Sequence, residues 1–315
     1  MKTKNKVFAG ITGIIILLLV AGLYIGTFKP PDQPSLGKKE YGVCIHIYQY
    51  DTTSTIQLLK QINASSVRID WIQGKMDSFV NTMKDNNISI LAILDHNTMI
   101  FQNLTEFTRL QWQETVQEIM STEAAKKVDA WEIWNEPNSD NFTLGYMDGT
   151  PQNYFDMLKD AYQIIKTASP NATILAAGLS PRTFSYGTWN EWLTDFANLS
   201  PQEFFDFQGV HIYDDVETNL AIISETKVII DKEIWITEIG NPSAPSNLIL
   251  EYSPLNQASF LETNYQRLSE MKIPIFWYQL IDEIDASEEK EKHFGLFDIH
   301  NNPKPAVDVF IRCAS

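Results

Sequence analysis

The sequence is poor in cysteine and in positive charge, and each shortage narrows the possible functions. Two cysteines among 315 residues cannot build a disulfide framework. A small buried thiol is the expected role of Cys44, although a bridge from Cys44 to Cys313 that ties the two ends of a domain stays open. The formal net charge of −16 leaves no basic face to neutralise phosphates, so nucleic acid is excluded as a partner.

Two kinds of binding motif are missing as well. The segment after the first expected strand, His46-Ile-Tyr-Gln-Tyr, has no glycine, whereas an open nucleotide-binding sheet usually carries a glycine-rich loop there. No His-x-His pair or carboxylate cluster stands at metal-ligand spacing. We therefore expect neither a cofactor nor a catalytic metal.

The sequence does contain one long uncharged run, over residues 7–28. A stretch of that length can span a bilayer, and three lysines before it favour a cytoplasmic N-terminus with the rest exported. A cleaved signal peptide is the alternative, although no good Ala-x-Ala site is evident. We expect residues 1–28 to anchor the protein in the cell membrane and residues 29–39 to form a proline-rich linker. Residues 40–315 then form one extracytoplasmic domain, which is secreted if the first segment is removed.

From about residue 40 onward, short apolar runs alternate with longer amphipathic segments. The runs are rich in β-branched residues and predict strands at 41–47, 65–70, 88–94, 128–134, 172–178, 206–212, 232–237 and 273–279. Helices are expected at 54–62, 110–121, 152–168, 255–271 and 304–312. Eight strands with intervening helices predict an α/β fold, a (β/α)₈ TIM barrel, preceded by the transmembrane helix.

Two glutamates stand where expected strands end. Glu136 follows the fourth strand in Trp131-Glu-Ile-Trp-Asn-Glu-Pro-Asn138, and Glu238 ends the seventh in Ile234-Trp-Ile-Thr-Glu-Ile-Gly240. Polar side chains just past the strands of a parallel barrel point into its mouth, where active sites form. Two carboxyls that meet there can divide between them the acid/base and nucleophile work of glycoside cleavage.

These motifs resemble those of the clan A retaining glycoside hydrolases, and most closely the family 39-like and family 5-like members. Asn135-Glu136-Pro137 matches the acid/base motif of the clan, and Glu238 matches its nucleophile. The tail Phe294-Gly-Leu-Phe-Asp also resembles the stretch that leads into the last helix of the clan. The resemblance covers nearly the whole region from 40 to 312 and implies a (β/α)₈ barrel.

The resemblance implies a role for each candidate site residue. Glu136 is the expected acid/base and Glu238 the expected nucleophile. Arg68, alone in an apolar strand, needs a partner, which is Glu238 or else Glu132. The expected substrate-binding residues are His46, Arg68, His96, Asn135, His211, Tyr213 and Trp277. Among them, Asn135 is expected to bind the sugar 2-hydroxyl and Trp277 to stack on a sugar ring.

The expected function is that of a retaining β-glycosidase or endoglycanase, acting as a monomer on a poly- or oligosaccharide by double displacement. Two alternatives stay open. One is a surface carbohydrate-binding protein that keeps the barrel without turnover. The other is a cell-surface transglycosylase, which uses the same covalent intermediate.

Overall fold

The computed structural model describes residues 41–47, 51–244, 252–286 and 288–314. The expected anchor at 1–28 and linker at 29–39 lie outside the described residues. Within the described ranges, no helix is both long enough and apolar enough to cross a bilayer.

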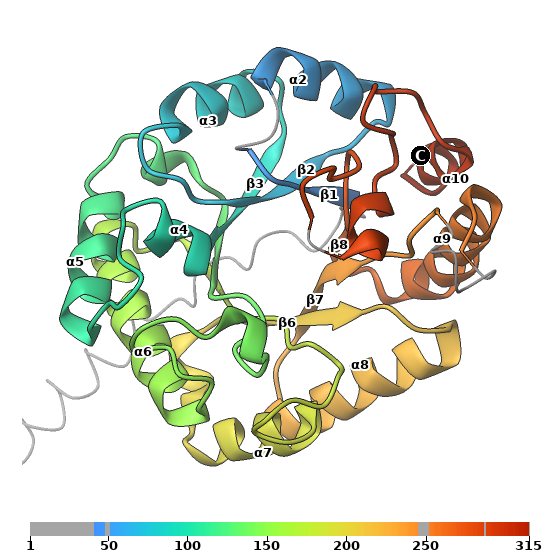
Figure 1. The fold of residues 1–315 in the computed structure, drawn as a ribbon. Coiled ribbons are helices and arrows are strands. Elements are labelled where there is room, and N and C mark those ends of the chain that lie inside the picture. The colour runs from blue at the N-terminus through green and yellow to red at the C-terminus, as the bar shows by residue number, and fades with distance from the viewer. Residues whose placement is uncertain (1–40, 48–50, 245–251, 287, 315) are drawn as a thin grey trace, which may run out of the picture. The chain divides into compact units, whose positions relative to one another are not determined.

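Eight parallel strands close into a barrel that helices surround (Figure 1). Each strand pairs with the next in chain order, and the last pairs with the first. The strands are β1 (Tyr41–Ile45), β2 (Ser66–Asp70), β3 (Ser89–Leu94), β4 (Ala130–Ile133), β5 (Thr173–Ala176), β6 (Phe207–Ile212), β7 (Ile234–Ile239) and β8 (Ile275–Trp277). The expected (β/α)₈ barrel is confirmed, and all eight strands overlap their predicted ranges.

Nine α-helices occur in the part of the chain that the structure describes. They are α2 (Thr52–Gln61), α3 (Met76–Asp85), α4 (His96–Ile100), α5 (Arg109–Met120), α6 (Pro151–Ala168), α7 (Trp189–Asn198), α8 (Val216–Ile230), α9 (Pro254–Leu268) and α10 (Pro305–Ala314). The five predicted helical segments are confirmed as α2, α5, α6, α9 and α10. Helix α8 was not predicted, because its many β-branched residues weaken the helical signal. Ile222, Ile223 and Ile230 of this helix are buried, and their packing stabilises the helix where its intrinsic helix propensity is low.

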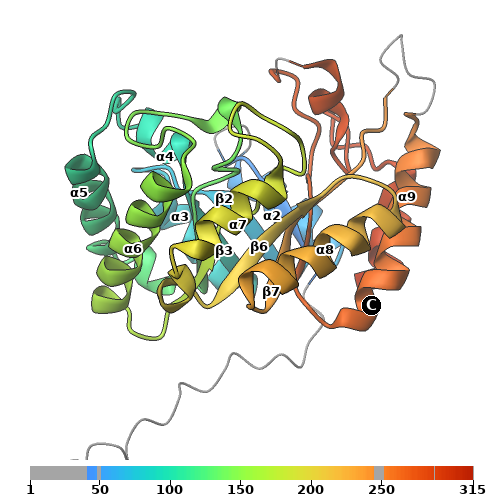
Figure 2. The same ribbon diagram turned by 90° about the horizontal axis from the view of Figure 1, so that it is seen from below.

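The loops that follow the strands gather on one face of the barrel, and the loop after β8 (red) stands out from it (Figure 2). A buried tyrosine of α6 fixes two of the strand ends there. The Tyr154 hydroxyl donates to the Ile133 carbonyl oxygen at 3.0 Å and accepts from the Ala177 N–H at 2.6 Å. The helix thereby holds the ends of β4 and β5 side by side, just before the Asn135-Glu136 pair.

Two glycines leave room inside the barrel for large polar side chains. A Cβ atom at Gly178 would come within 2.2 Å of the His211 ring, and one at Gly209 within 2.8 Å of a Glu132 oxygen. Contacts that short are not tolerated, so both positions need a residue without a side chain. The space that they leave is occupied by residues of the site described next.

Candidate active site

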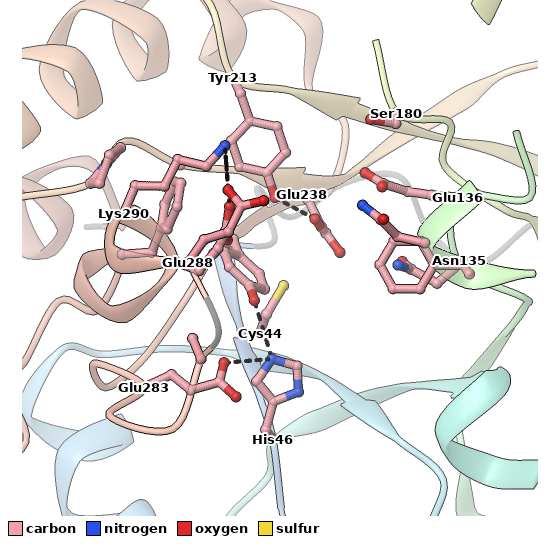
Figure 3. A pocket seen from close by; sticks show the side chains of 18 of the residues that line it. Cys44, His46, Asn135, Glu136, Ser180, Tyr213, Glu238, Glu283, Glu288 and Lys290 are labelled. Carbon is pink, nitrogen blue, oxygen red and sulfur yellow. Dashed lines mark hydrogen bonds and ion pairs between the residues drawn. The ribbon is translucent and has the colours of Figure 1, made fainter. Parts of the chain in front are cut away.

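Glu136 and Glu238 lie close together at the mouth of the barrel, as the sequence predicted. A carboxylate oxygen of each and a ring nitrogen of His211 all lie within 4.8 Å of one another. Both glutamates line a cavity of about 860 Å³ at the carboxyl ends of the strands. Figure 3 shows the side chains of Glu136 and Glu238 near each other, with Tyr213 hydrogen-bonded to Glu238.

The backbone that carries Glu136 is held in an unusual conformation. Trp134 and Glu136 have φ angles of 70° and 42°, in the left-handed region that non-glycine residues rarely adopt. Backbone bonds to the neighbouring strands hold this turn. Trp134 N–H donates to the Leu94 carbonyl at 2.8 Å, and Glu136 N–H donates to the Gly178 carbonyl at 3.1 Å. Strain of this kind persists only where the surroundings enforce it, and it is concentrated at functional sites.

Arg68 is the centre of the polar network below the cavity. Its guanidinium is buried and donates from Nε to Glu132 at 2.6 Å, from Nη1 to Glu238 at 2.5 Å and from Nη2 to Asn135 at 2.9 Å. The sequence favoured Glu238 as the partner of Arg68, with Glu132 as the alternative, and the structure pairs Arg68 with both. Arg68 therefore contacts Glu238 directly. It also holds the side chain of Asn135, the residue that precedes Glu136 in the chain.

Glu238 is held in its ionised form by three groups. Burial alone would raise the pKa of this carboxyl, but His211, Arg68 and a hydrogen bond from Tyr213 outweigh burial and hold the pKa below its ordinary value. Tyr213 donates its hydroxyl proton to the second Glu238 oxygen. Burial, together with the adjacent Glu238, raises the pKa of the Tyr213 hydroxyl well above its usual value, so this residue stays a donor.

His211 lies between the two candidate carboxyls. Its Nδ1 is 3.0 Å from a Glu136 oxygen and 3.5 Å from a Glu238 oxygen. Burial lowers its pKa, but both carboxylates counter that effect and the net shift is upward. The ring is fully buried, so it acts on the two glutamates rather than on a molecule in the cavity.

A second charged cluster lines the β1–β3 side of the cavity. His46 Nδ1 lies 2.7 Å from Asp70, and its Nε2 lies 3.4 Å from the Tyr278 hydroxyl and 4.0 Å from Glu283. Burial lowers the pKa of His46, but Asp70 and Glu283 more than offset this and raise it to about 9. An imidazolium with carboxylates beside it offers both donors and acceptors to a ligand with hydroxyl groups.

His96 also faces this side of the cavity. It lies at the start of α4, and its Nδ1 is 3.2 Å from Asp95. The sequence analysis placed His46 and His96 at the cavity, as the structure does, but it did not identify their acidic partners. Asp70 could have been found, because it stands two residues after Arg68 on the same strand and therefore on the same face.

The prediction for Trp277 is wrong in this structure. Its side chain is 0% exposed, and its indole N–H donates to the Phe294 carbonyl at 3.2 Å. It packs edge-on against Phe260, away from the cavity, so it has no face on which a ligand could stack. The next residue, Tyr278, lines the cavity instead. Successive residues point to opposite sides of the barrel wall, and the sequence did not fix which of Trp277 and Tyr278 faces the cavity.

The two cysteines are not joined to each other. Cys44 is buried below Arg68, and its thiol lies 3.5 Å from the Thr237 carbonyl oxygen. Burial raises its pKa strongly, so the thiol stays protonated. This agrees with the expected buried thiol, and the bridge to Cys313 that the sequence left open does not form among the described residues.

Glu136, His211 and Glu238 also have the composition of a metal site. In this structure, however, Arg68 lies 2.5 Å from one Glu238 oxygen and Tyr213 donates to the other. The negative charge of Glu238 is therefore already balanced by Arg68. A divalent cation would meet the guanidinium as a like charge.

A family profile described as the glycosyl hydrolase catalytic core matches residues 85–273 of the chain. None of the curated proteins matches the sequence at a significant level.

Solved structures with the same fold include three enzymes of the glycoside hydrolase and glucanosyltransferase classes. A family 39 glycoside hydrolase from Bacteroides cellulosilyticus WH2 is 22% identical, with a TM-score of 0.64 over 88% of this chain and 64% of that one. A β-1,3-glucanosyltransferase from Rhizomucor miehei is 15% identical, with a TM-score of 0.64 over 85% and 96%. A family 128 endo-β-1,3-glucanase from Amycolatopsis mediterranei is 12% identical, with a TM-score of 0.58 over 87% and 99%. The chain thus spans less than two thirds of the family 39 enzyme, and at these identities the likeness shows the fold.

The His46–Asp70 pair predicts a pH dependence of stability. The folded-state pKa of His46 is about 9, above its ordinary 6.5, so its contribution is fully present below pH 6.5 and is lost as the pH rises through 9. Between pH 6 and pH 9.5 the free energy of unfolding of the wild type should fall by about 3 kcal/mol more than that of His46→Gln. Urea denaturation at pH 6 and pH 9.5 measures both. His300→Gln, at an exposed position, serves as the control and should behave as the wild type. Equal losses in wild type and His46→Gln would contradict the ion pair.

Proposed function

The chain belongs to the glycosyl hydrolase catalytic core family, and on that basis we propose that it is a retaining enzyme that cleaves β-glycosidic bonds of a poly- or oligosaccharide. The observation that carries the proposal is the spacing of the two carboxyls. Oxygen atoms of Glu136 and Glu238 lie within 4.8 Å of each other. Retaining enzymes hold their carboxyls about 5–5.5 Å apart, whereas inverting enzymes separate them by about 6.5–9.5 Å to admit a water molecule.

The contacts favour Glu238 as the nucleophile. It is the carboxyl that Arg68 and Tyr213 hold ionised, and its ionised oxygen would attack the anomeric carbon. Glu136 would donate a proton to the departing oxygen. In the second step Glu136 would take a proton from water, and that water would release the sugar from Glu238 with net retention.

The side-chain NH₂ group of Asn135 is available to bind the substrate. Its carbonyl oxygen accepts from Arg68 at 2.9 Å, which turns its NH₂ group away from the guanidinium. Asn135 lines the cavity, so this NH₂ can donate to a sugar hydroxyl next to the reacting carbon. Such a bond strengthens as the transition state forms and contributes several kcal/mol together with ring distortion.

The cavity is suited to more than a single sugar unit. Its volume of about 860 Å³ lies in the upper part of the range for ligand sites. We propose a β-linked glycan, in line with the enzymes of the same fold, which include an endo-β-1,3-glucanase and a β-1,3-glucanosyltransferase. A carbohydrate-binding protein without turnover is less well supported, because such a protein has no need of a nucleophile held ionised by Arg68 and Tyr213.

Substitution of each carboxyl tests the roles separately. Glu238→Gln should abolish turnover of every substrate, because no covalent intermediate can form. Glu136→Gln should lose about 10²–10⁴-fold on natural glycans, and much less on glycosides whose leaving group needs no proton. Steady-state rates on a polysaccharide panel and on nitrophenyl glycosides measure the difference. Full activity in Glu238→Gln would sink the assignment.

The stereochemistry of the reaction is a second test. Carboxyls at this spacing leave no room for a water molecule between them and the sugar, so the first-formed product should keep the β configuration. Proton NMR of the anomeric signal within the first minutes of reaction, on a glycan cleaved in the panel, measures this. An α-anomer as the first product would mean that Glu238 acts as a base on water.

We also propose that the enzyme is held at the outer face of a cell membrane by the uncharged run at 7–28. The lysines before that run support this orientation. Protease added to intact cells should then degrade the catalytic domain, whereas a cytoplasmic protein of the same cells serves as the protected control. Protection of the catalytic domain until the cells are lysed would contradict the proposal.

A further inference from the structure

Glu132 is a buried carboxylate that the mechanism above does not use. It is 0% exposed and lies on β4, four residues before Glu136. One of its oxygens accepts from Arg68 Nε at 2.6 Å. The other accepts from the Gly178 N–H at 3.0 Å and the Thr237 hydroxyl at 3.1 Å. Both oxygens are therefore satisfied, and the carboxylate is fixed between β2, the segment just after β5, and β7.

Glu132 and Glu238 share one guanidinium. Arg68 presents Nε to Glu132 and Nη1 to Glu238, at 2.6 and 2.5 Å. Two carboxylates thus face a single positive charge inside the barrel, where screening by water is weak. The second carboxylate adds a negative charge to a site that already holds one.

We propose that Glu132 is a positioning residue that acts through Arg68. Its carboxylate offsets part of the positive charge of the guanidinium, so that Glu238 stays ionised but keeps enough basicity to act as a nucleophile. The inference rests on the proposed role of Glu238 as nucleophile. If Arg68 faced Glu238 alone, the cation would stabilise the ionised carboxylate more strongly. A carboxylate stabilised in that way is a weaker base and a weaker nucleophile.

Several other charged or titratable groups face Glu238 directly or through Arg68, and Glu132→Gln leaves all of them in place. They are Cys44 on β1 with His46 after it, Arg68 on β2, Glu136 after β4, His211 on β6 with Tyr213 after it, and Tyr278 after β8. The substitution therefore changes one charge in a fixed setting. Removing a negative charge that shares the guanidinium should lower the pKa of Glu238 by about one unit or more.

The titration of Glu238 can be measured without a substrate. Protein labelled with carbon-13 at the glutamate side-chain carboxyls is titrated by NMR, and the Glu238 signal is identified by its loss in Glu238→Gln. In Glu132→Gln the midpoint should fall by about one pH unit or more, or the signal should stay ionised down to the lowest pH at which the variant is folded. Glu132→Asp keeps the charge and should titrate close to the wild type.

A matched control removes a different buried charge. Asp160 is 7% exposed, pairs with Arg109 at 2.6 and 2.9 Å between α5 and α6, and does not line the cavity. Asp160→Asn loses an arginine–carboxylate pair with the same Nε–O distance of 2.6 Å but should leave the Glu238 midpoint unchanged. Circular dichroism checks folding of each variant. If Glu132→Gln does not fold, Glu132→Met, which is similar in volume and has no competing amide donor, carries the same expectation.

The kinetic readout separates this proposal from the proposed function. In Glu132→Gln the acidic limb of kcat/KM should move down with the NMR midpoint, and the rate of covalent-intermediate formation should fall. An unchanged or raised midpoint in the folded variant would overturn the role of Glu132. Equal downward shifts in Glu132→Gln and Glu132→Asp would overturn it too, because charge would not be the cause. A lowered midpoint in a protein without glycosidase activity would instead reject the proposed function and leave the charge sharing in place.

Discussion

The site depends on a buried guanidinium, which is only 3% exposed. Arg68 enters the barrel from β2, and an unpaired charge in that position would be prohibitively costly. Its three partners, Glu132, Asn135 and Glu238, come from two other strands and the turn after one of them. Loss of one partner from such a buried pair typically costs about 3–5 kcal/mol. The network therefore fixes the relative positions of β2, β4 and β7 at the place where the chemistry is proposed.

The barrel makes this network possible because parallel strands bring their carboxyl ends to one rim. Residues separated by about 170 positions, Arg68 and Glu238, thereby meet at 2.5 Å. Gly178 and Gly209 add the space that the His211 ring and Glu132 need, and Tyr154 holds the ends of β4 and β5 together. The left-handed turn at Trp134 and Glu136 is then enforced by its neighbours rather than favoured by its own residues.

Charged groups shift the pKa values of His46 and Glu238 in opposite directions on two sides of the cavity. The wall formed by β1 and β2 carries His46, whose pKa is raised to about 9 against its Asp70 partner. Around Glu238 the balance is different, because burial is opposed by His211, Arg68 and Tyr213 and the pKa falls. One side of the cavity thus holds an ion pair, and the other holds the carboxyl of Glu238 in its ionised form.

The sequence alone determined the eight strands, the barrel and the two glutamates at the strand ends. Apolar runs with β-branched residues are local signals, and a polar residue that ends such a run marks the barrel mouth without knowledge of the rest of the chain. The tertiary structure alone decided which groups meet. Arg68 proved to bind both Glu132 and Glu238, the last strand buried Trp277 away from the cavity, and Asp70 and Glu283 became partners of His46. Such contacts depend on strand register and on where each strand ends, and a change of one residue in either moves a side chain to the opposite face.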